Sequence, residues 1–342
     1  MTDRDSPLSV TVAGIRLKNP VIAGAGEATM DAAGIRAAVD AGAAAAVAKS
    51  TNESPEAARP LASAEYALLD EYWEPLPWGS APRAASLFCR SGLPAIPFDD
   101  WVGILSDEDA HARKVNAYVI GSLIVSDPQE AARRAKEMQA AGLRWIELNL
   151  GAPHGEETAP DAIVFSRGGA DVAELVRPIR ESVTIPLTVK LGAEGDVFAM
   201  VQAAIGSGAD SVCLASRHLA FVPDPTTRRP VLGTFGAIGG AWALPLTLRW
   251  IAKARQRFGP EVQLIGTNGA RDGKDVARFL LAGARAVEMT SAVITDGPAA
   301  LSRAIDELER YLQEQRATAE DIIGEAADHA MRYSDVTGEA LG

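Results

Sequence analysis

Eight short apolar runs of strand-forming residues recur along the chain, and amphipathic helical patterns separate most of them. The helical patterns place apolar residues three and four positions apart, as one face of a helix requires. Repeated alternation of strand and helix predicts a parallel sheet, and eight such units close into a (β/α)8 TIM barrel. The eight runs are residues 20–26, 44–50, 117–125, 145–152, 186–193, 211–217, 262–269 and 286–291.

The 342 residues are interpreted as a single α/β domain, 1–342, with the barrel over about 20–315. Residues 8–19 alternate like an N-terminal β-hairpin that would cap the barrel bottom. Residues 51–115 are rich in Pro, Trp and Tyr and are predicted to form an irregular insertion over the barrel top. The tail, 316–342, is predicted to be a polar helix.

Composition excludes several classes of protein. A formal charge of −12 and a pI near 4.9 repel polyphosphates, so a nucleic-acid partner is not expected. No leader-like or membrane-spanning apolar stretch is visible. Cys89 and Cys213 give no disulfide framework or cluster-binding set, which favours a cytoplasmic location. No metal site is expected, because the four histidines lack ligand spacing: His111, His154, His218 and His329.

Active sites of such barrels lie at the carboxyl ends of the strands, where two lysines stand out. Lys49 and Lys190 end otherwise apolar runs, where an unpaired ammonium is costly unless it faces a cleft and an anionic partner. The alternative is that each lysine reaches solvent or pairs with a local carboxylate.

The last two runs end in a Gly-rich turn, IGTNGARDG (265–273), and in EMTSA (288–292). This is the usual barrel phosphate site, where backbone N–H groups and a helix N-terminus hold an anion. A second Gly-rich stretch (233–245) lets backbone approach a ligand closely, or is a flexible loop. No GxGxxG fingerprint and no GxSxG elbow occurs.

The chain resembles the dihydroorotate dehydrogenase family, FMN-dependent barrels, over about residues 8–315. The resemblance rests on NPVIAGAG (19–26), AVAKS (46–50), PLTVKLG, FGAIGGAWALP, the run from 265 to 292, and ELNLGAPHG (147–155) against the family's ELNLSCPN. The chain is also similar to the pyrimidine-reducing domain of dihydropyrimidine dehydrogenase, which shares the position of His154.

The resemblance implies FMN as cofactor, with its phosphate at the last two strands and its ring across the barrel mouth. It places Lys190 near the N1/C2 edge of the ring, where a cation would stabilise the anionic reduced flavin. The implied FMN-binding residues are Gly24, Ala25, Gly26, Lys49, Ser50, Asn149, Lys190, Ala215, Gly239, Gly240, Thr267, Asn268, Gly269, Thr290 and Ser291.

The family's catalytic Cys or Ser is replaced by Ala152, whose methyl cannot accept a proton. Ser216 and His154 stand where the family has substrate-binding Asn residues, and Arg217 follows Ser216. We therefore expect a small cyclic or carboxylate-bearing substrate other than dihydroorotate, held by Asn149 and these residues. His154, Lys49 and Arg217 are the candidate catalytic residues.

Other interpretations remain open. One is an authentic dihydroorotate or dihydropyrimidine dehydrogenase with a displaced base, and another is a flavin-binding protein without turnover. A third is a flavin-free aldolase-type barrel that uses Lys190 or Lys49 as a Schiff base. The resemblance also implies a homodimer.

Overall fold

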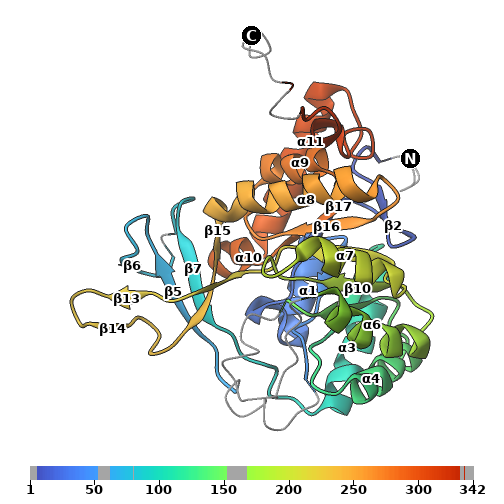
Figure 1. Ribbon diagram of the computed structural model, residues 1–342, viewed down its shortest axis with the longest axis horizontal. Helices are drawn as coiled ribbons and strands as arrows, with labels where there is room; N and C mark the ends of the chain where they lie inside the picture. Colours follow the sequence, from blue (N-terminus) through green and yellow to red (C-terminus); the bar gives the residue numbers. More distant parts are fainter. Residues whose placement is uncertain (1–5, 53–61, 80, 152–167, 332–334, 336–342) are drawn as a thin grey trace.

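The computed structural model of the protein describes residues 6–52, 62–79, 81–151, 168–331 and 335. Its centre is a closed parallel barrel with the strand order β10-β11-β16-β17-β3-β4-β8-β9, in which β9 pairs with β10 (Figure 1). Each of the eight predicted runs contains or overlaps one of these strands, so the (β/α)8 barrel is confirmed. The strands are β3 (Val21–Ala23), β4 (Ala45–Val47), β8 (Tyr118–Leu123), β9 (Ile146–Asn149), β10 (Leu187–Lys190), β11 (Ser211–Leu214), β16 (Leu264–Thr267) and β17 (Ala284–Met289).

Helices follow the strands and cover the outside of the barrel (Figure 1). Aspartates begin α1, α4, α7 and α9, where each side chain accepts a hydrogen bond from a backbone N–H of the first turn. The helices are α1 (Ala32–Asp40), α3 (Phe98–Arg113), α4 (Pro128–Ala140), α6 (Gly169–Ser182), α7 (Val197–Gly206), α8 (Leu244–Phe258), α9 (Gly273–Ala282), α10 (Ser291–Asp296), α11 (Ala299–Gln315) and α12 (Glu325–Asp328).

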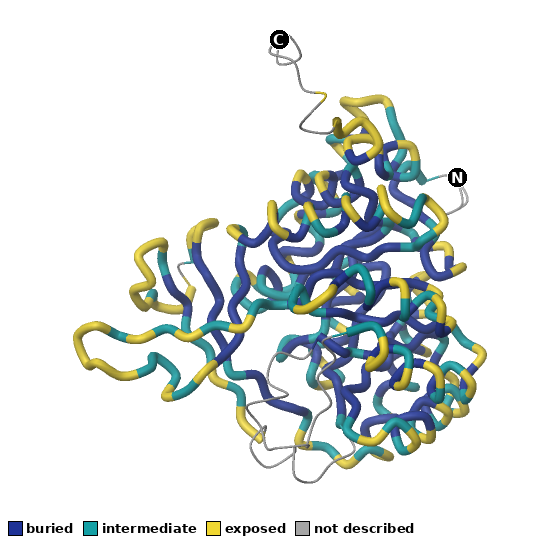
Figure 2. The backbone as a smooth tube through the Cα atoms, in the orientation of Figure 1, coloured by how far each residue is buried: buried dark blue, intermediate teal, exposed yellow. Residues whose placement is uncertain are grey.

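The barrel strands are buried almost throughout, as the dark interior of Figure 2 shows. Strands covered on both faces read as continuous apolar runs rather than as alternating patterns, which is why these eight stand out in the sequence. The few polar side chains inside are paired. Trp145 Nε1 donates to Thr188 Oγ1 at 2.8 Å, and Thr188 Oγ1 lies 2.8 Å from Ser211 Oγ.

A second sheet stands beside the barrel and projects from it (Figure 1). Its order is β12-β15-β7-β5-β6, and a small hairpin of β13 and β14 extends it; we call this sheet and hairpin the arm. The arm strands are β5 (Glu65–Leu69), β6 (Pro75–Leu76), β7 (Ser86–Arg90), β12 (His218–Ala220), β13 (Pro223–Asp224), β14 (Arg229–Pro230) and β15 (Gly236–Gly240).

The arm corrects one prediction and removes one alternative. The described part of residues 51–115 is not irregular, since it supplies three arm strands and the helix α3. The Gly-rich stretch 233–245 is not a flexible loop, since it contains β15, which pairs with β7 and β12, and the short helix η3 (Ala241–Ala243). Pairing of strands about 150 residues apart leaves no periodic pattern in either segment. The arm strands in 65–90 and in 218–240 could therefore not be predicted from their local sequence.

The first described residues pack against the segment after α11, where Ala319 N donates to Pro7 O at 2.7 Å. The predicted N-terminal hairpin is present as β1 (Val10–Val12) and β2 (Ile15–Leu17), and Arg285, early in β17, donates to Thr11 O at 3.2 Å. The tail is not the single polar helix that was predicted. After α11 it runs through turns into the four-residue helix α12, because Arg316 and Gly324 take left-handed backbone conformations.

None of the helices in the described part of the chain is both long and apolar enough to span a membrane.

Candidate active site

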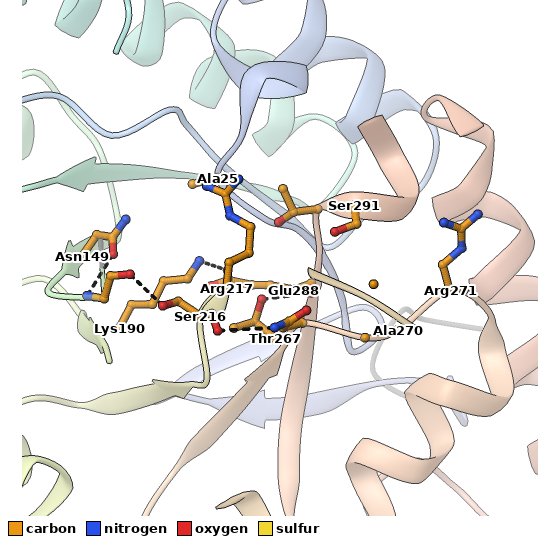
Figure 3. Close-up of a pocket in the computed structure, with 15 residues that line it drawn as sticks. Ala25, Asn149, Lys190, Ser216, Arg217, Thr267, Ala270, Arg271, Glu288 and Ser291 are labelled. Atoms are coloured by element: carbon orange, nitrogen blue, oxygen red, sulfur yellow. Dashed lines mark hydrogen bonds and ion pairs between the residues drawn. The ribbon is translucent and has the colours of Figure 1, made fainter. Parts of the chain in front are cut away.

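A pocket opens at the carboxyl ends of the barrel strands (Figure 3). It encloses about 630 Å³ of empty space, open solvent at its mouth included, which is in the range of small-molecule and cofactor sites. The strands β9, β10, β16 and β17, the arm strand β15 and the loops after them build its walls. The lining residues are Ala25, Asn149, Gly151, Lys190, Ser216, Arg217, Gly240, Thr267, Asn268, Gly269, Ala270, Arg271, Glu288, Thr290 and Ser291.

One end of the pocket is formed by the turn after β16. Asn268 and Gly269 both take left-handed backbone conformations, with φ of +70° and +117°. A Cβ at Gly269 would come within 2.6 Å of the backbone of Leu244, so the turn needs glycine for its contact with α8 as well. The amide of Asn268 is buried, and its Oδ1 has no hydrogen-bond partner among the described residues.

The start of α10 completes this end. Thr290 and Ser291 line the pocket with their hydroxyl groups, and the buried guanidinium of Arg271 lies nearby, held by Asp296 at 3.1 Å. Hydroxyls, the backbone of a Gly-rich turn and a guanidinium form a donor set suited to a phosphate group.

The floor of the pocket carries an ion pair. Lys190 Nζ donates to Glu288 Oε2, and both side chains line the pocket (Figure 3). A second carboxylate, Glu147, has its Oε2 at 3.7 Å from the same Nζ. Burial lowers the pKa of Lys190, but the charges of Glu147 and Glu288 outweigh it and raise the pKa above its usual value. Lys190 is therefore a charged ammonium that faces the pocket and has an anionic partner, the arrangement that the sequence required of a lysine at a buried strand end.

The pairing has two chemical consequences. A Schiff base requires a neutral amine, so a Lys190 held charged is unsuited to the aldolase-type alternative.

Glu147, Glu288 and the Cys213 thiol place ligand atoms within 4.8 Å of one another, a geometry that could hold a metal ion. Lys190 already supplies a cation there, and burial raises the pKa of Cys213, so the thiol stays protonated.

A hydrogen-bond chain links this floor to β4. Ser122 Oγ donates to Glu147 Oε1 at 3.2 Å and lies 2.8 Å from Ser50 Oγ, to which Asn149 Nδ2 donates at 3.3 Å. Asn149 Oδ1 in turn accepts from Gly151 N at 3.2 Å. The chain fixes the orientation of the Asn149 amide at the pocket wall.

A second group of charges lies above the ends of β3 and β4. Lys49 Nζ donates to Glu27 Oε1 at 2.7 Å, and both are largely buried. Burial lowers the pKa of Lys49 and the positive charge of Arg217 adds to this, against the opposing charge of Glu27. Lys49 thus also has a carboxylate partner, as the alternative reading stated.

Arg217 is held differently. Its guanidinium contacts Cys89 Sγ and donates to Ser91 Oγ at 2.6 Å, both on or just after β7. Among the described residues no ion pair joins Arg217 to a carboxylate, although Glu27 lies close enough for the guanidinium to lower the pKa of that carboxyl group.

Gly151 closes the wall after β9. Ser216 Oγ donates to Gly151 O at 2.7 Å, and a Cβ on Gly151 would lie 2.6 Å from that hydroxyl and 2.8 Å from Gly192 N. The glycine is therefore required by close backbone packing. Ala152 and His154 lie outside the described residues.

The structure brings most of the predicted site residues together, although none of their individual roles is tested by it. Buried beside the pocket without lining it are Gly24, Gly26, Lys49, Ser50, Ala215 and Gly239. Lining it are Ala25, Asn149, Lys190, Ser216, Arg217, Gly240, Thr267, Asn268, Gly269, Thr290 and Ser291.

Sequence reasoning missed Arg271 and Glu288 in the lining, and Glu27 as the partner of Lys49. Glu288 had a usable signal, because an acidic residue near the end of a buried strand implies a buried cation. Glu27 had none, since it follows the predicted strand as an ordinary loop residue.

The fold and the pocket define a class of protein: a (β/α)8 barrel with a phosphate-type site after its last two strands. Comparison with known sequences gives the family. The model of the family described as dihydroorotate dehydrogenase matches residues 84–312, and the chain belongs to this family. The resemblance stated from the motifs is thereby confirmed, and with it FMN as the cofactor of the family.

Curated relatives carry the same family name. The chain is 34% identical over 200 residues to the dihydroorotate dehydrogenase B (NAD(+)) catalytic subunit of Desulforudis audaxviator, covering 58% of this chain and 63% of that protein. It is 35% identical over 187 residues to a putative dihydroorotate dehydrogenase A (fumarate) of Solibacter usitatus, covering 54% and 60%. These matches span less than two thirds of either relative.

A third relative aligns over nearly the whole length. The dihydroorotate dehydrogenase B (NAD(+)) catalytic subunit of Thermoplasma acidophilum is 26% identical over 328 residues, 93% of this chain and 98% of the relative.

The residues of the pocket fit FMN. The unpartnered Asn268 Oδ1 and the hydroxyls of Thr290 and Ser291 offer polar groups at one end. Just after β3, a Cβ at Gly24 would come within 2.3 Å of Thr290 Oγ1. The glycine therefore lets the end of β3 approach the start of α10 closely.

Proposed function

We propose that the protein is an FMN-dependent oxidoreductase that moves a hydride between the cofactor and a CH–CH, C=C or C–N bond. Its substrate is a small anionic molecule, cyclic or carboxylate-bearing, other than dihydroorotate. The observation that carries the proposal is the pocket itself, which has hydrogen-bond donors for a phosphate group at one end and the guanidinium of Arg217 at its wall, with no ion pair to Arg217 among the described residues.

In this proposal the cofactor phosphate is held by Asn268, Gly269, Thr290 and Ser291, with Gly240 completing the cradle. Asn149 is pre-oriented by its two hydrogen bonds and positions the ring. Bound FMN supplies the hydride acceptor and donor, while the chain binds, orients and moves the proton.

Substrate binding is assigned to Arg217. Its contacts with Cys89 and Ser91 use two of its five N–H donors, so donors remain for a carboxylate. Ser216 is already committed to Gly151 O, which leaves it a lone pair for the substrate but not its proton.

The proton that accompanies the hydride needs a new carrier, because Ala152 cannot serve. We assign it to His154, with Lys49 as the second candidate. Lys49 is suited to this because its pKa is lowered toward neutral pH. Its ammonium group is therefore a stronger acid than that of an ordinary lysine.

Dihydroorotate is the second candidate substrate, because the curated relatives are named for it. The test is anaerobic mixing of the FMN-loaded protein with dihydroorotate, dihydropyrimidines, other cyclic amides and small carboxylates, followed by flavin bleaching. We expect bleaching by an anionic member of the panel and none by dihydroorotate. Bleaching by dihydroorotate would replace our substrate assignment, and a protein that stays yellow with every compound would be a flavin-binding protein without turnover.

Arg217→Met separates recognition from chemistry in the same assay. We expect the KM for the anionic substrate to rise by at least about tenfold, with the FMN content unchanged. An unchanged KM would remove Arg217 from the substrate site.

We also propose that the protein acts in the cytoplasm as a homodimer. The arm supports the assembly, since it carries exposed aromatic side chains that a partner surface would cover: Tyr72, Trp73, Trp78, Phe221 and Phe235.

A further inference from the structure

The floor of the pocket buries more charge than cofactor binding requires. Lys190, Glu147 and Glu288 have only 5%, 1% and 2% of their surface exposed, and they come from three different barrel strands. Burying one ammonium and two carboxyl groups costs a large desolvation free energy unless the positive and negative charges balance.

The two carboxyl groups are not equivalent. Glu288 accepts directly from Lys190 Nζ and lines the pocket. Glu147 lies at 3.7 Å from the same Nζ, does not line the pocket, and has an Oε2 without a hydrogen-bond partner among the described residues.

The geometry therefore places the negative charge on Glu288 and a proton on Glu147. Burial, reinforced by the charge of Glu288, raises the pKa of Glu147 well above its usual value, in agreement with this assignment. The trio of Lys190, Glu288 and Glu147 then has no net charge.

We propose that Glu288 sets the reduction potential of the cofactor by neutralising Lys190 at the floor of the pocket. The inference rests on the proposed FMN site. A hydride brings one proton and two electrons, so its acceptance adds one negative charge to the cofactor unless a second proton follows. An unpaired Lys190 would favour that charge, whereas Lys190 paired with Glu288 does not, and the bound cofactor stays a stronger reductant.

This inference adds a counter-charge to the expectation that Lys190 is a cation beside the flavin edge. Glu288 is not a catalytic residue, since it acts by neutralising the charge of Lys190 and does not contact the substrate. Its effect should appear in the potential even when no substrate is present.

The test compares two substitutions that differ by one atom type at two equally buried carboxyl groups. Glu288→Gln removes a charge, whereas Glu147→Gln replaces a neutral acid with a neutral amide. Anaerobic redox titration of the FMN-loaded proteins against a reference dye should show a positive shift of the midpoint potential in E288Q and a potential close to wild type in E147Q. An unchanged potential in E288Q, or equal shifts in both variants, would overturn the proposal.

Sulfite provides a second readout that needs no turnover. It adds to flavin N5, and the adduct carries a negative charge on the ring, so its affinity reports the same electrostatics. We expect E288Q to bind sulfite at least about tenfold more tightly than wild type, since one nearby buried charge is removed. E147Q should bind it like wild type.

Lys190→Met combined with Glu288→Gln covers the case in which E288Q alone does not fold. This double variant is as neutral as the native pair, so its sulfite affinity should stay near the wild-type value, and a large change would contradict the proposal. A wild-type protein that does not take up FMN would instead refute the proposed function.

Discussion

At the scale of single residues, the site is a set of buried charges that are balanced in pairs. Glu27 and Lys49 are one such pair, joined at 2.7 Å. Burial raises the pKa of Glu27, but the ammonium of Lys49 and the guanidinium of Arg217 outweigh it, so the pKa lies below its usual value of 4.5. A carboxylate with a depressed pKa stabilises the fold above its unfolded-state pKa and loses that contribution as the pH falls through its folded-state pKa.

Glu27→Gln tests this balance. The substitution leaves Lys49 buried without its counter-charge, so we expect the free energy of unfolding to fall by about 3 kcal/mol at pH 7. The difference from wild type should narrow as the pH falls from 4.5 through the lower folded-state pKa of Glu27, because the unfolded state takes up the proton first. Urea unfolding of both proteins at a series of pH values measures this difference in the free energy of unfolding.

The matched control is Glu65→Gln, which breaks the exposed pair of Glu65 and Arg90 on the arm. Its cost should be below about 1 kcal/mol. A destabilisation by E27Q that does not change with pH would contradict the assignment.

The sequence located both site lysines but neither of their partners. Lys49 pairs with a residue 22 positions away and Lys190 with one 98 positions away, across the barrel. Strand ends can be read from local apolar runs, whereas a partner from another strand depends on how the barrel closes.

At the scale of secondary-structure elements, Asp275 connects the arm to the barrel. This carboxylate in α9 is fully buried, accepts from Arg83 Nη2 at 2.7 Å and from Arg271 N at 2.9 Å, and also pairs with Arg278. Arg83 lies just before β7, and Arg271 follows the Gly-rich turn after β16 and lines the pocket. The Asp275 carboxylate therefore holds the arm, this turn and helix α9 together.

Asp275→Asn should therefore destabilise the protein by about 2–4 kcal/mol, because two guanidinium groups and a backbone N–H lose a buried anion. Arg278→Gln, which removes only the half-exposed partner at i+3, should cost below about 1 kcal/mol. Thermal or urea unfolding of both variants checks the ranking, and equal losses would be incompatible with the role given to Asp275.

The elements themselves were predicted unevenly. Helices α4, α6, α7 and α9 lie between the predicted strands, as the apolar periodicity indicated, and an Asp cap begins α4, α7 and α9. The arm was not predicted, since β7 pairs with β15 and Ala237 faces Cys89 across the sheet.

At the scale of the whole molecule, the arm stands out from the barrel with much of its surface exposed (Figure 2). Phe221 and Phe235 contact each other at 4.9 Å between ring centroids, and both are about half exposed. Aromatic rings gathered on a projecting sheet are typical of an interface rather than of a solvated edge.

Light scattering after size-exclusion chromatography should accordingly give twice the 35.9 kDa mass of the chain. Phe235→Glu should shift the mass to that of one chain, because a charge would be buried in the proposed interface. A monomeric wild type would refute the homodimer without affecting the FMN site.

The overall architecture and the position of the pocket followed from the eight runs and the last two strand ends. The catalytic proton carrier did not, because Ala152 removes the residue that the family pattern would identify and His154 lies outside the described residues. The position of Arg217, to which we assign substrate recognition, depends on contacts from β7 and the residue after it, which the sequence did not place near it.

The central claim is that the turn after β16 and the start of α10 hold the phosphate of FMN, and comparison of FMN with riboflavin tests it most directly. Fluorescence titration of the flavin-free protein should give one FMN per chain, bound at least about a hundredfold more tightly than riboflavin. Ser291→Ala should weaken FMN binding and leave riboflavin binding unchanged. Equal affinities for the two flavins, or no binding of either, would contradict the account.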